Sequence, residues 1–408
     1  AKLANPDWAP DFGPAEYNHK VIATGATAIG ARPFLIAFNV NLNTKSTRKA
    51  MKIAATIREM GMYCKDEKGR FIVNEKGEKY REPGMFKCVK AIGWYIEEYG
   101  CCQVSINFTD YRVSSVHDVV DATRRVADRE GVIVTGCELV GLIPLDAMLQ
   151  AGWHYLRRQE VNPGVPEKEV VEVAIRSLGL RDLGPFDANE AIIEHRIDSD
   201  GPLVSKTGRE FIDALSSDAP APGGGSVAAL CGAMSTGLAA MVGQLTTGKK
   251  GYQKLDDEMN AMAVKAQTLK ERFLADIDED TAAFDAIMTA FGLPKKSAAE
   301  KKARHDAIQS ATRHAIEIPL GVLERTVETV GLVKVAIRGN ENARSDAGVA
   351  ALTAEACAEG AWYNVCINLQ DFEDQAASAD FRARADTALA TVTEQVAEIR
   401  ALVRSQLG

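Results

Sequence analysis

Several common signatures are missing from this sequence of 408 residues. None of its eight cysteines forms a Cys-x-x-Cys pair, which argues against zinc-ribbon and redox motifs and favours reduced thiols in a cytoplasmic protein. The six histidines show no His-Glu-x-x-His motif and no grouping with cysteine, so no metal site is expected. No apolar run reaches the roughly 18 residues that span a bilayer, so no membrane partner is expected.

Basic residues are also too few for a general nucleic-acid or membrane surface. The chain has 48 Lys and Arg against 56 Asp and Glu, which gives a net charge of −8 at pH 7. This acidic balance argues against nucleic acid as a partner. Hydrophobic residues make up 46% and charged residues 25%, as in ordinary globular proteins, and the length suggests two or three domains.

The first half of the sequence alternates strand and helix patterns. Strands are expected at 34–42, 89–96, 103–108 and 132–135, with amphipathic helices at 46–60 and 116–129. The resulting β-α-β-β-α-β order predicts an α/β domain of the ferredoxin-like kind. Two further helices, at 145–158 and 167–178, complete this domain, which we assign to residues 1–182. Residues 64–85 are interpreted as a polar excursion and 183–205 as a linker.

The second half, residues 206–408, contains only helical patterns. Helices are expected at 210–215, 226–245, 255–290, 298–330, 343–374 and 379–406. Short connections between long helices predict an all-α antiparallel bundle, in which Pro319 bends the fourth helix. The helix at 226–245 is apolar nearly all round, so we expect it to be central and buried. Its many small residues would also allow close approach across a subunit interface.

A glycine-rich turn precedes this apolar helix. Gly223, Gly224 and Gly225 are followed by Ser226, and glycines there would let backbone N–H groups approach a ligand. A helix N-terminus favours a negatively charged group. The alternative is a flexible helix entry with Ser226 as the N-cap. The turn is not a Walker loop, because no Gly-Lys-Ser/Thr follows.

The helix at 255–290 carries an acidic side chain on its apolar stripe. Phe273, Ile277 and Phe284 lie on one face of the helix, and Asp280 falls between the last two at three- and four-residue steps, on the same face. Asp276 lies one turn away. A carboxylate on a buried face must be paired, protonated or functional, and burial would raise its pKa toward that of a general acid. A surface acid cluster, or a core Asp bonded to a hydroxyl, would explain the pattern equally well.

A polar cluster at 339–346 opens the helix at 343–374. Helix capping explains most of it, while Arg344 would be available to bind a carboxylate. Asn364 and Asn368 interrupt the apolar run further along this helix, and buried amides there would need hydrogen-bond partners.

Several motifs together resemble the formiminotransferase-cyclodeaminase family of folate enzymes. In the first half they are DWAPDFGP at 7–14, FLIAFN at 34–39, AIGWY at 91–95 and LVGLIPL at 139–145. In the second half they are APGGGS at 221–226 and YNVCINL at 363–369. The resemblance covers nearly the whole sequence.

The resemblance implies a multifunctional transferase and lyase of histidine degradation. Its bundle would close 5-formiminotetrahydrofolate to 5,10-methenyltetrahydrofolate and release ammonia, with Asp280 as the catalytic residue. Its first half would belong to glutamate formiminotransferase, which moves a formimino group from N-formiminoglutamate to tetrahydrofolate. The folate-binding positions that match the family are Gly13, Pro14, Gly25, Gly84 and Glu138. A cytoplasmic homo-oligomer of dimers, acting on polyglutamylated tetrahydrofolate without a metal, is also implied.

One departure from the family affects the transferase. Its first subdomain, which carries a catalytic histidine in a His-Lys-Gly-Glu-His-Pro-like motif, is expected to be absent from this sequence, so that transfer would need another chain to supply it. Two alternatives remain for the bundle and the whole chain. The bundle also resembles a methenyltetrahydrofolate cyclohydrolase, and the chain could be a non-catalytic folate-binding scaffold.

Overall fold

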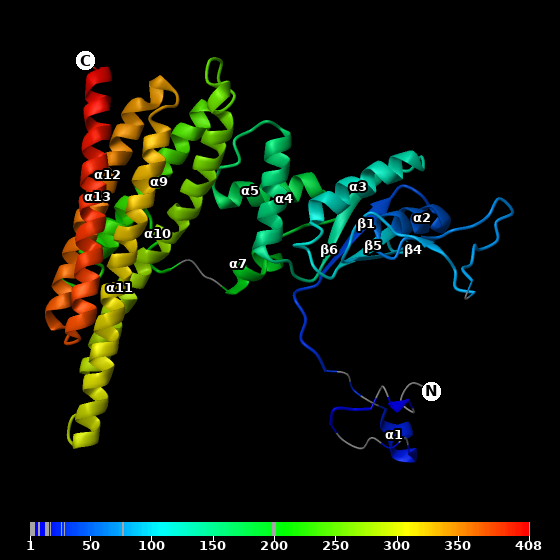
Figure 1. The fold of residues 1–408 in the computed structure, drawn as a ribbon, viewed down its shortest axis with the longest axis horizontal. Coiled ribbons are helices and arrows are strands. Elements are labelled where there is room, and N and C mark those ends of the chain that lie inside the picture. Colours follow the sequence, from blue (N-terminus) through cyan, green and yellow to red (C-terminus); the bar gives the residue numbers. More distant parts are fainter. Residues whose placement is uncertain are drawn as a thin grey trace.

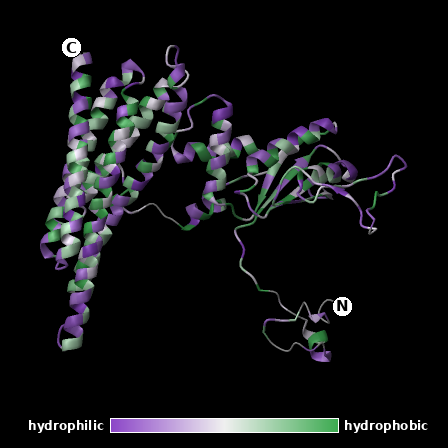
Figure 2. Ribbon diagram, viewed as in Figure 1, coloured by the Kyte–Doolittle hydropathy of each residue, from purple (hydrophilic) through white to green (hydrophobic). Residues whose placement is uncertain are grey.

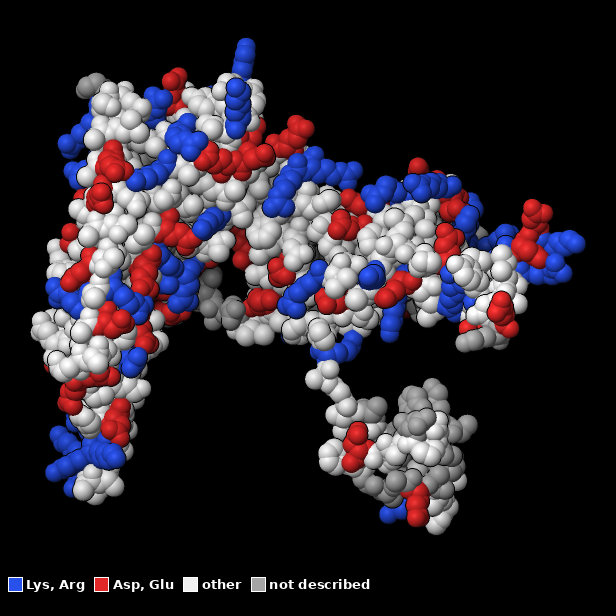
Figure 3. All heavy atoms as spheres, in the orientation of Figure 1, with Lys and Arg blue, Asp and Glu red and all other residues white. Residues whose placement is uncertain are grey.

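The computed structural model describes residues 5–6, 9–12, 16, 18–25, 27, 29–75, 77–197 and 201–407. A small sheet with helices and a bundle of long helices follow one another along the chain (Figure 1). The prediction of an α/β domain followed by a helix bundle is thereby confirmed. On the face drawn in Figure 3, Lys and Arg are interspersed with Asp and Glu.

Four strands form the main sheet: β1 (Ile36–Leu42), β4 (Val89–Ile96), β5 (Cys101–Phe108) and β6 (Val134–Val140). Their spatial order is β4-β5-β1-β6, and each neighbouring pair is antiparallel. Helices α2 (Thr47–Ile57) and α3 (Val116–Arg129) belong to the same hydrophobic core. In β4, Val89 and Ala91 are buried whereas Ile92 and Trp94 are exposed, so one face of the sheet packs on the core and the other is open (Figure 2).

The sheet domain differs from the sequence prediction at three places. Strand β6 runs to Val140 rather than ending at 135, because it pairs with β1 along its length despite Gly136 at φ 157°. Strand β2 (Met62–Tyr63) comes just before the polar excursion and β3 (Arg81–Glu82) lies within it, and the two pair antiparallel at the base of an arm that projects from the domain (Figure 1). Short helices α6 (Ala188–Ala191) and α7 (Ile193–Ile197) occupy part of the expected linker.

Helices α4 (Leu145–Arg158) and α5 (Glu167–Leu178) pack together on the bundle side of the sheet domain (Figure 1). The loop between them reaches the bundle. Asn162 Nδ2 donates to Thr247 Oγ1 at 2.8 Å, and Gln267 Nε2 donates to the Gly164 carbonyl at 2.9 Å. A Cβ at residue 164 would overlap Ala263, so glycine permits this close approach of the two domains.

The bundle consists of the short helix α8 (Gly208–Leu215) and five long helices, α9 (Gly224–Thr246), α10 (Asp256–Phe291), α11 (Ala298–Ala336), α12 (Arg344–Asn368) and α13 (Gln375–Leu407). A capping box of Ser297 and Glu300 begins α11, which continues through the buried Pro319. Helix α9 packs against α10 and α12. It is antiparallel to α12, because Thr246 at its end contacts Asn340 just before α12, and Gly224 at its start approaches Asn364 near the end of α12.

The expectation that α9 is buried nearly all round is corrected. By length and composition this helix could cross a membrane, since it has 23 residues and an 18-residue window of mean hydropathy 1.5. Of that window 61% is buried inside the protein, as in a core helix. The helix is not buried all round, however. Val227, Met234, Met241 and Leu245 form an exposed stripe at seven- and four-residue steps.

Candidate functional site

Asp280 lies on α10 and faces the first turn of α9. The Ser226 hydroxyl is 3.2 Å from Asp280 Oδ2 and 2.9 Å from the Ile277 carbonyl oxygen. It also lies 3.4 Å from Thr281 Oγ1. When Ser226 donates to Ile277, its oxygen can accept a hydrogen bond from a protonated Asp280. When it donates to Asp280, it stabilises the carboxylate. The Ser226 hydroxyl can therefore form a hydrogen bond with Asp280 whether this side chain is protonated or ionised.

Burial is the main influence on the acidity of Asp280. Desolvation raises the pKa of this carboxyl above its ordinary value, and hydrogen bonds from Ser226 oppose the rise. In the described part of the chain, no cationic side chain contributes to the shift. A carboxyl that is partly shielded from water and has no cationic partner can hold a proton at higher pH than a surface Asp. It is therefore suited to general acid–base chemistry.

The neighbouring carboxylates on α10 have structural partners. Asp276 is fully buried and forms an ion pair with Arg325 of α11, while Arg272 Nη2 lies 3.1 Å from its Oδ1. Asp278 accepts hydrogen bonds from the backbone amides of residues 203 and 204, at 2.8 and 3.1 Å, and so fixes the segment that leads into the bundle. Of the candidate acids, Asp280 alone combines partial burial with a hydroxyl partner among the residues described.

The glycine-rich turn lies directly beside this carboxylate. A Cβ at residue 225 would overlap the Asp280 carboxylate, so glycine lets the two helices approach at this point. Gly223, and not Ser226, is the N-cap of α9, and it makes no side-chain cap. The prediction that Ser226 caps the helix is therefore wrong: its hydroxyl bonds to α10 instead. The amide of Asn364 on α12 borders the turn, since its Nδ2 lies 3.5 Å from an ideal Cβ at Gly224.

Arg344 does not join this group. It lies in the first turn of α12, twenty residues before Asn364, and therefore about 30 Å from it at 1.5 Å per helical residue. Its guanidinium is 4.0 Å from the Glu341 carboxylate. In this chain Arg344 thus lies near the opposite end of the bundle from Asp280 and the glycine turn.

A second polar group lies on the open face of the sheet. Glu138 on β6 accepts hydrogen bonds from Asn39 Nδ2, Gln103 Nε2 and the Tyr99 hydroxyl, each at 3.1 Å. Gln103 is buried and also donates to Asn41 Oδ1 at 2.8 Å. The three donors come from β1, β5 and the turn between β4 and β5, so the network fixes the Glu138 carboxylate on the open face of the sheet. Only the strand alternation could have indicated this network in the sequence.

Gly25 and Gly84, the other predicted folate-binding positions that the structure describes, are not gathered around Glu138. Gly13 and Pro14 lie outside the described residues. Gly25 ends α1 (His19–Thr24), which lies apart from the sheet (Figure 1). Gly84 lies between the arm and β4, at the opposite edge of the sheet from β6, where a Cβ would overlap the Arg58 carbonyl. For these positions folate binding remains a prediction.

Three cavities near the junction of the two domains have other linings. A cleft of about 840 Å³ lies between Arg157 and Pro163 of the sheet domain and Thr247, Asp257 and Val264 of the bundle. Two smaller cavities, of about 170 and 240 Å³, adjoin Trp153. None of the predicted site residues lines these three cavities.

The chain is similar to known folate enzymes. The family model described as Formiminotransferase-cyclodeaminase matches residues 207–387, and the model described as Formiminotransferase domain matches residues 37–198. Formimidoyltransferase-cyclodeaminase of Sus scrofa is 37% identical over 402 residues, which cover 97% of this chain and 70% of the relative. Methenyltetrahydrofolate cyclohydrolase of Methylorubrum extorquens is 41% identical over 173 residues, 42% of this chain and 83% of the relative. The crystal structure of formiminotetrahydrofolate cyclodeaminase from Thermotoga maritima aligns with a TM-score of 0.42 and 29% identity, over 50% of this chain and 96% of that one.

Proposed function

Because this chain belongs to the formiminotransferase-cyclodeaminase family, we propose that its bundle converts 5-formiminotetrahydrofolate to 5,10-methenyltetrahydrofolate and ammonia. Asp280 is the proton-transfer residue of this proposal. The observation that carries it is the position of this carboxyl, which is desolvated, bonded to Ser226 and free of a cationic partner among the described residues. The glycine turn beside it would border the substrate.

The reaction needs one group that can both give and accept a proton. The folate N10 amine attacks the formimino carbon and forms a tetrahedral centre, from which nitrogen must leave as ammonia. Attack on the protonated formimino group leaves an amino group on the tetrahedral carbon; a neutral Asp280 donates one proton to this departing nitrogen, and its carboxylate then accepts the proton that N10 loses. General acid–base catalysis of this kind contributes roughly 10²- to 10⁴-fold, and the positioning of N10 adds a proximity effect. Ser226 stabilises either form of Asp280 during the cycle.

Absorbance of the methenyl product tests this assignment. With 5-formiminotetrahydrofolate as substrate, Asp280→Asn should lower turnover by at least about 100-fold, because an amide cannot exchange the proton. Asp285→Asn, an exposed position on the same helix, is the matched control and should retain turnover. Near-normal product formation by Asp280→Asn, with an unchanged circular dichroism spectrum, would discard the assignment.

A cyclohydrolase is the second candidate for the bundle. It is favoured by the 41% identity to a methenyltetrahydrofolate cyclohydrolase, which exceeds the identity to the bifunctional relative. Water would then attack the methenyl carbon, and the same Asp280 could move the proton. Supplying 5,10-methenyltetrahydrofolate and following its loss separates the two reactions. Folate binding without turnover of either substrate would instead favour a non-catalytic scaffold.

We infer that the sheet domain binds folate as part of a glutamate formiminotransferase. The family model over 37–198 and the Glu138 network on the open sheet face support this inference. A ferredoxin-like sandwich is the topology that we propose for the domain, supported by the strand order β4-β5-β1-β6. Transfer of the formimino group from N-formiminoglutamate would need the family's catalytic histidine from elsewhere. Tetrahydrofolate binding to the wild type and to Glu138→Ala tests the folate part, and equal affinities would contradict it.

We also propose that the chain forms a homo-oligomer of dimers through α9 and α12. The exposed stripe of α9 is matched on α12 by Val349, Leu352, Tyr363 and Ile367, all at least 47% exposed. Adjacent antiparallel helices with such stripes form an apolar surface typical of subunit contacts. A cytoplasmic location, a part in histidine degradation and a preference for polyglutamylated folate belong to the same proposal, by family membership alone.

A further inference from the structure

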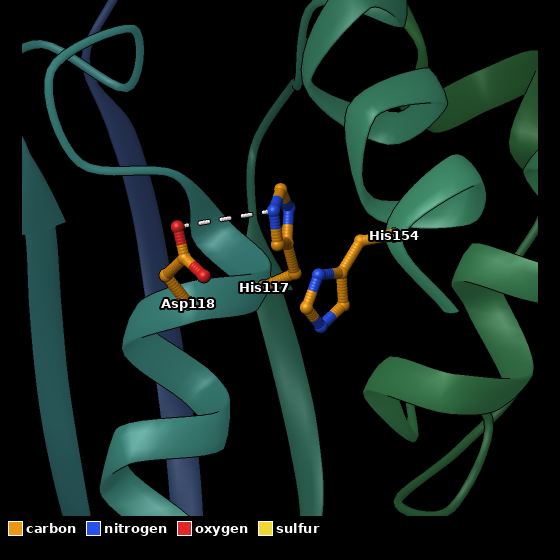
Figure 4. A group of neighbouring side chains, drawn as sticks. All are labelled: His117, Asp118 and His154. Carbon is orange, nitrogen blue, oxygen red and sulfur yellow. Dashed lines mark ion pairs between the residues drawn. The ribbon is translucent and has the colours of Figure 1, made fainter. Parts of the chain in front are cut away.

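Two of the six histidines come together where the first turn of α3 meets α4 (Figure 4). The rings of His117 and His154 are stacked with their centroids 4.4 Å apart and a tilt of 28°. Asp118 adds a carboxylate, and one donor atom from each of the three side chains lies within 4.8 Å of the other two. This group could not be predicted from the sequence, because 36 residues separate the two histidines and only the packing of α3 on α4 brings them together.

We propose that His117, Asp118 and His154 form a binding site for a divalent transition-metal ion of the zinc class, which would link α3 to α4. Two imidazoles and one carboxylate are a common ligand set for Zn²⁺, with a fourth position left for water. The site opens onto the cavity of about 240 Å³, whose lining includes both histidines, Gln150 and Trp153. This cavity has room for the fourth ligand.

The surroundings of His154 match those of a metal ligand. Its Nε2 lies 3.2 Å from Asp121 Oδ2, and Asp121 is 7% exposed. Hydrogen bonds from Tyr155 and Arg158, at 3.1 and 2.9 Å, hold that carboxylate in place. His154 therefore donates its Nε2 proton to Asp121 and keeps a lone pair on Nδ1. Histidines that bind metals usually donate their second nitrogen to a carboxylate in this way.

The hydroxyl of Ser115 contacts both His117 and Asp118. The Ser115 hydroxyl donates to Asp118 Oδ2 at 2.6 Å and lies 3.1 Å from His117 Nε2, and Nε2 and Oδ2 are 3.9 Å apart. The His117 side chain is 11% exposed, and burial lowers its pKa.

Metal binding would require a small contraction of the group. Metal–donor distances of about 2.1 Å in a tetrahedral site place the donors about 3.4 Å apart. The present separations, up to 4.8 Å, must therefore shorten by as much as about 1.4 Å. Asp118 and His154 have side chains that are 57% and 31% exposed, so both can rotate toward the ion.

One nearby charge opposes the ion. Arg157 lines the same cavity and lowers the pKa of His117 through its positive charge. Arg124 and Arg158 also face the site, but both are paired with Asp121. Arg157→Gln should therefore bind the metal a few-fold more tightly, with the gain reduced by solvent screening.

Metal titration of the full chain tests the proposal. After chelator treatment, Zn²⁺ is titrated by calorimetry and Co²⁺ by absorbance. His154→Gln and His117→Gln should each weaken one site by at least about 100-fold, whereas His305→Gln, an exposed histidine on α11, should not. Because all eight cysteines are retained, binding by thiols would persist in every variant and would show a thiolate-to-cobalt charge-transfer band.

Two outcomes would overturn the proposal. One is equal metal affinity and stoichiometry in the wild type and the folded histidine variants. The other is cobalt spectra that show thiolate ligation alone. If a histidine variant fails to fold, Asp118→Asn replaces it, since that side chain is mostly exposed, and an unchanged affinity would again contradict the site.

Discussion

The carboxylate of Asp280 lies against the Cα of Gly225, with no room for a methyl group between them. This contact joins the glycine turn of α9 to the acid of α10. It gives the third glycine of the turn a steric role: a side chain there would push Asp280 away from Ser226 or separate the two helices.

Gly225→Ala should therefore damage both stability and turnover. The added methyl group overlaps the Asp280 carboxylate, and overpacking of this kind costs about 1–3 kcal/mol. Gly237→Ala is the matched control on the same helix, because a Cβ there meets nothing within 4 Å and alanine favours a helix. Urea unfolding and methenyl formation should separate the variants. Equal stability of Gly225→Ala and Gly237→Ala would contradict the prediction, because it would mean that the two helices move apart at residue 225 without cost.

The pH profile of turnover should depend on Ser226. Hydrogen bonds from Ser226 lower the pKa of Asp280, so their loss in Ser226→Ala raises that pKa further. If the neutral acid donates the proton, turnover falls as pH rises through this pKa, and the falling limb should move to higher pH in the variant. Ser216→Ala, at the C-cap of α8, serves as control. A limb that moves to lower pH would contradict the role of Ser226.

Asp280 was predicted from the hydrophobic periodicity of its helix, whereas Glu138 was predicted only from the resemblance to the family. The apolar periodicity of α10 placed Asp280 on a buried face, and the structure adds that Ser226 is its partner. Spacing along one helix could not separate Asp280 from Asp276, because the partner of Asp276, Arg325, lies 49 residues further along the chain. Packing between residues far apart in the sequence therefore determines which carboxylate is paired with a cation.

The fold was predictable where a local pattern matched its environment. Helix α3 matches its expected bounds of 116–129, because Ser115 caps it and Val119 and Val126 face the core. Strand β6 was predicted too short, since Gly136 and Glu138 hide the strand pattern that pairing with β1 imposes. The exposed stripe of α9 was missed for a related reason: an all-apolar helix gives no sign of which face lacks neighbours in its own chain.

The ion pair of Asp276 and Arg325 should contribute strongly to bundle stability. Arg325→Gln leaves the fully buried Asp276 with less compensation, which should cost about 3 kcal/mol in urea unfolding. Arg338→Gln breaks an exposed pair with Glu258 and should cost less than about 1 kcal/mol.

The stability that Arg325→Gln removes should depend on pH in a direction that the structure predicts. Burial raises the folded pKa of Asp276 above its ordinary value, while Arg325 opposes the rise. A raised folded pKa means that stability is lost as pH rises through it. Removing Arg325 raises the pKa further, so the cost of Arg325→Gln should grow from acid to neutral pH. A cost that shrinks over this range would contradict the pairing.

Glu138 should control the ionisation of Tyr99. The hydrogen bond from the Tyr99 hydroxyl to Glu138 raises the pKa of this tyrosine, because the carboxylate disfavours a tyrosinate beside it. In Glu138→Gln, ultraviolet titration should show one tyrosine ionising at lower pH. The same substitution in a Tyr99→Phe background should leave the titration unchanged. A shift that survives in that background would belong to another tyrosine.

The exposed stripes of α9 and α12 predict a subunit contact that a single charge can weaken. Met234 is 44% exposed at the middle of the α9 stripe, so Met234→Glu would place a carboxylate inside the proposed interface. Burying an unpaired charge costs well over 1.4 kcal/mol, and the dissociation constant of the dimer should rise by more than about tenfold. Met288→Glu is the control, because that residue is similarly exposed at 52% but lies near the end of α10, away from the stripe. Sedimentation velocity at several concentrations measures both. An unchanged assembly in Met234→Glu would place the contact on another face of the bundle.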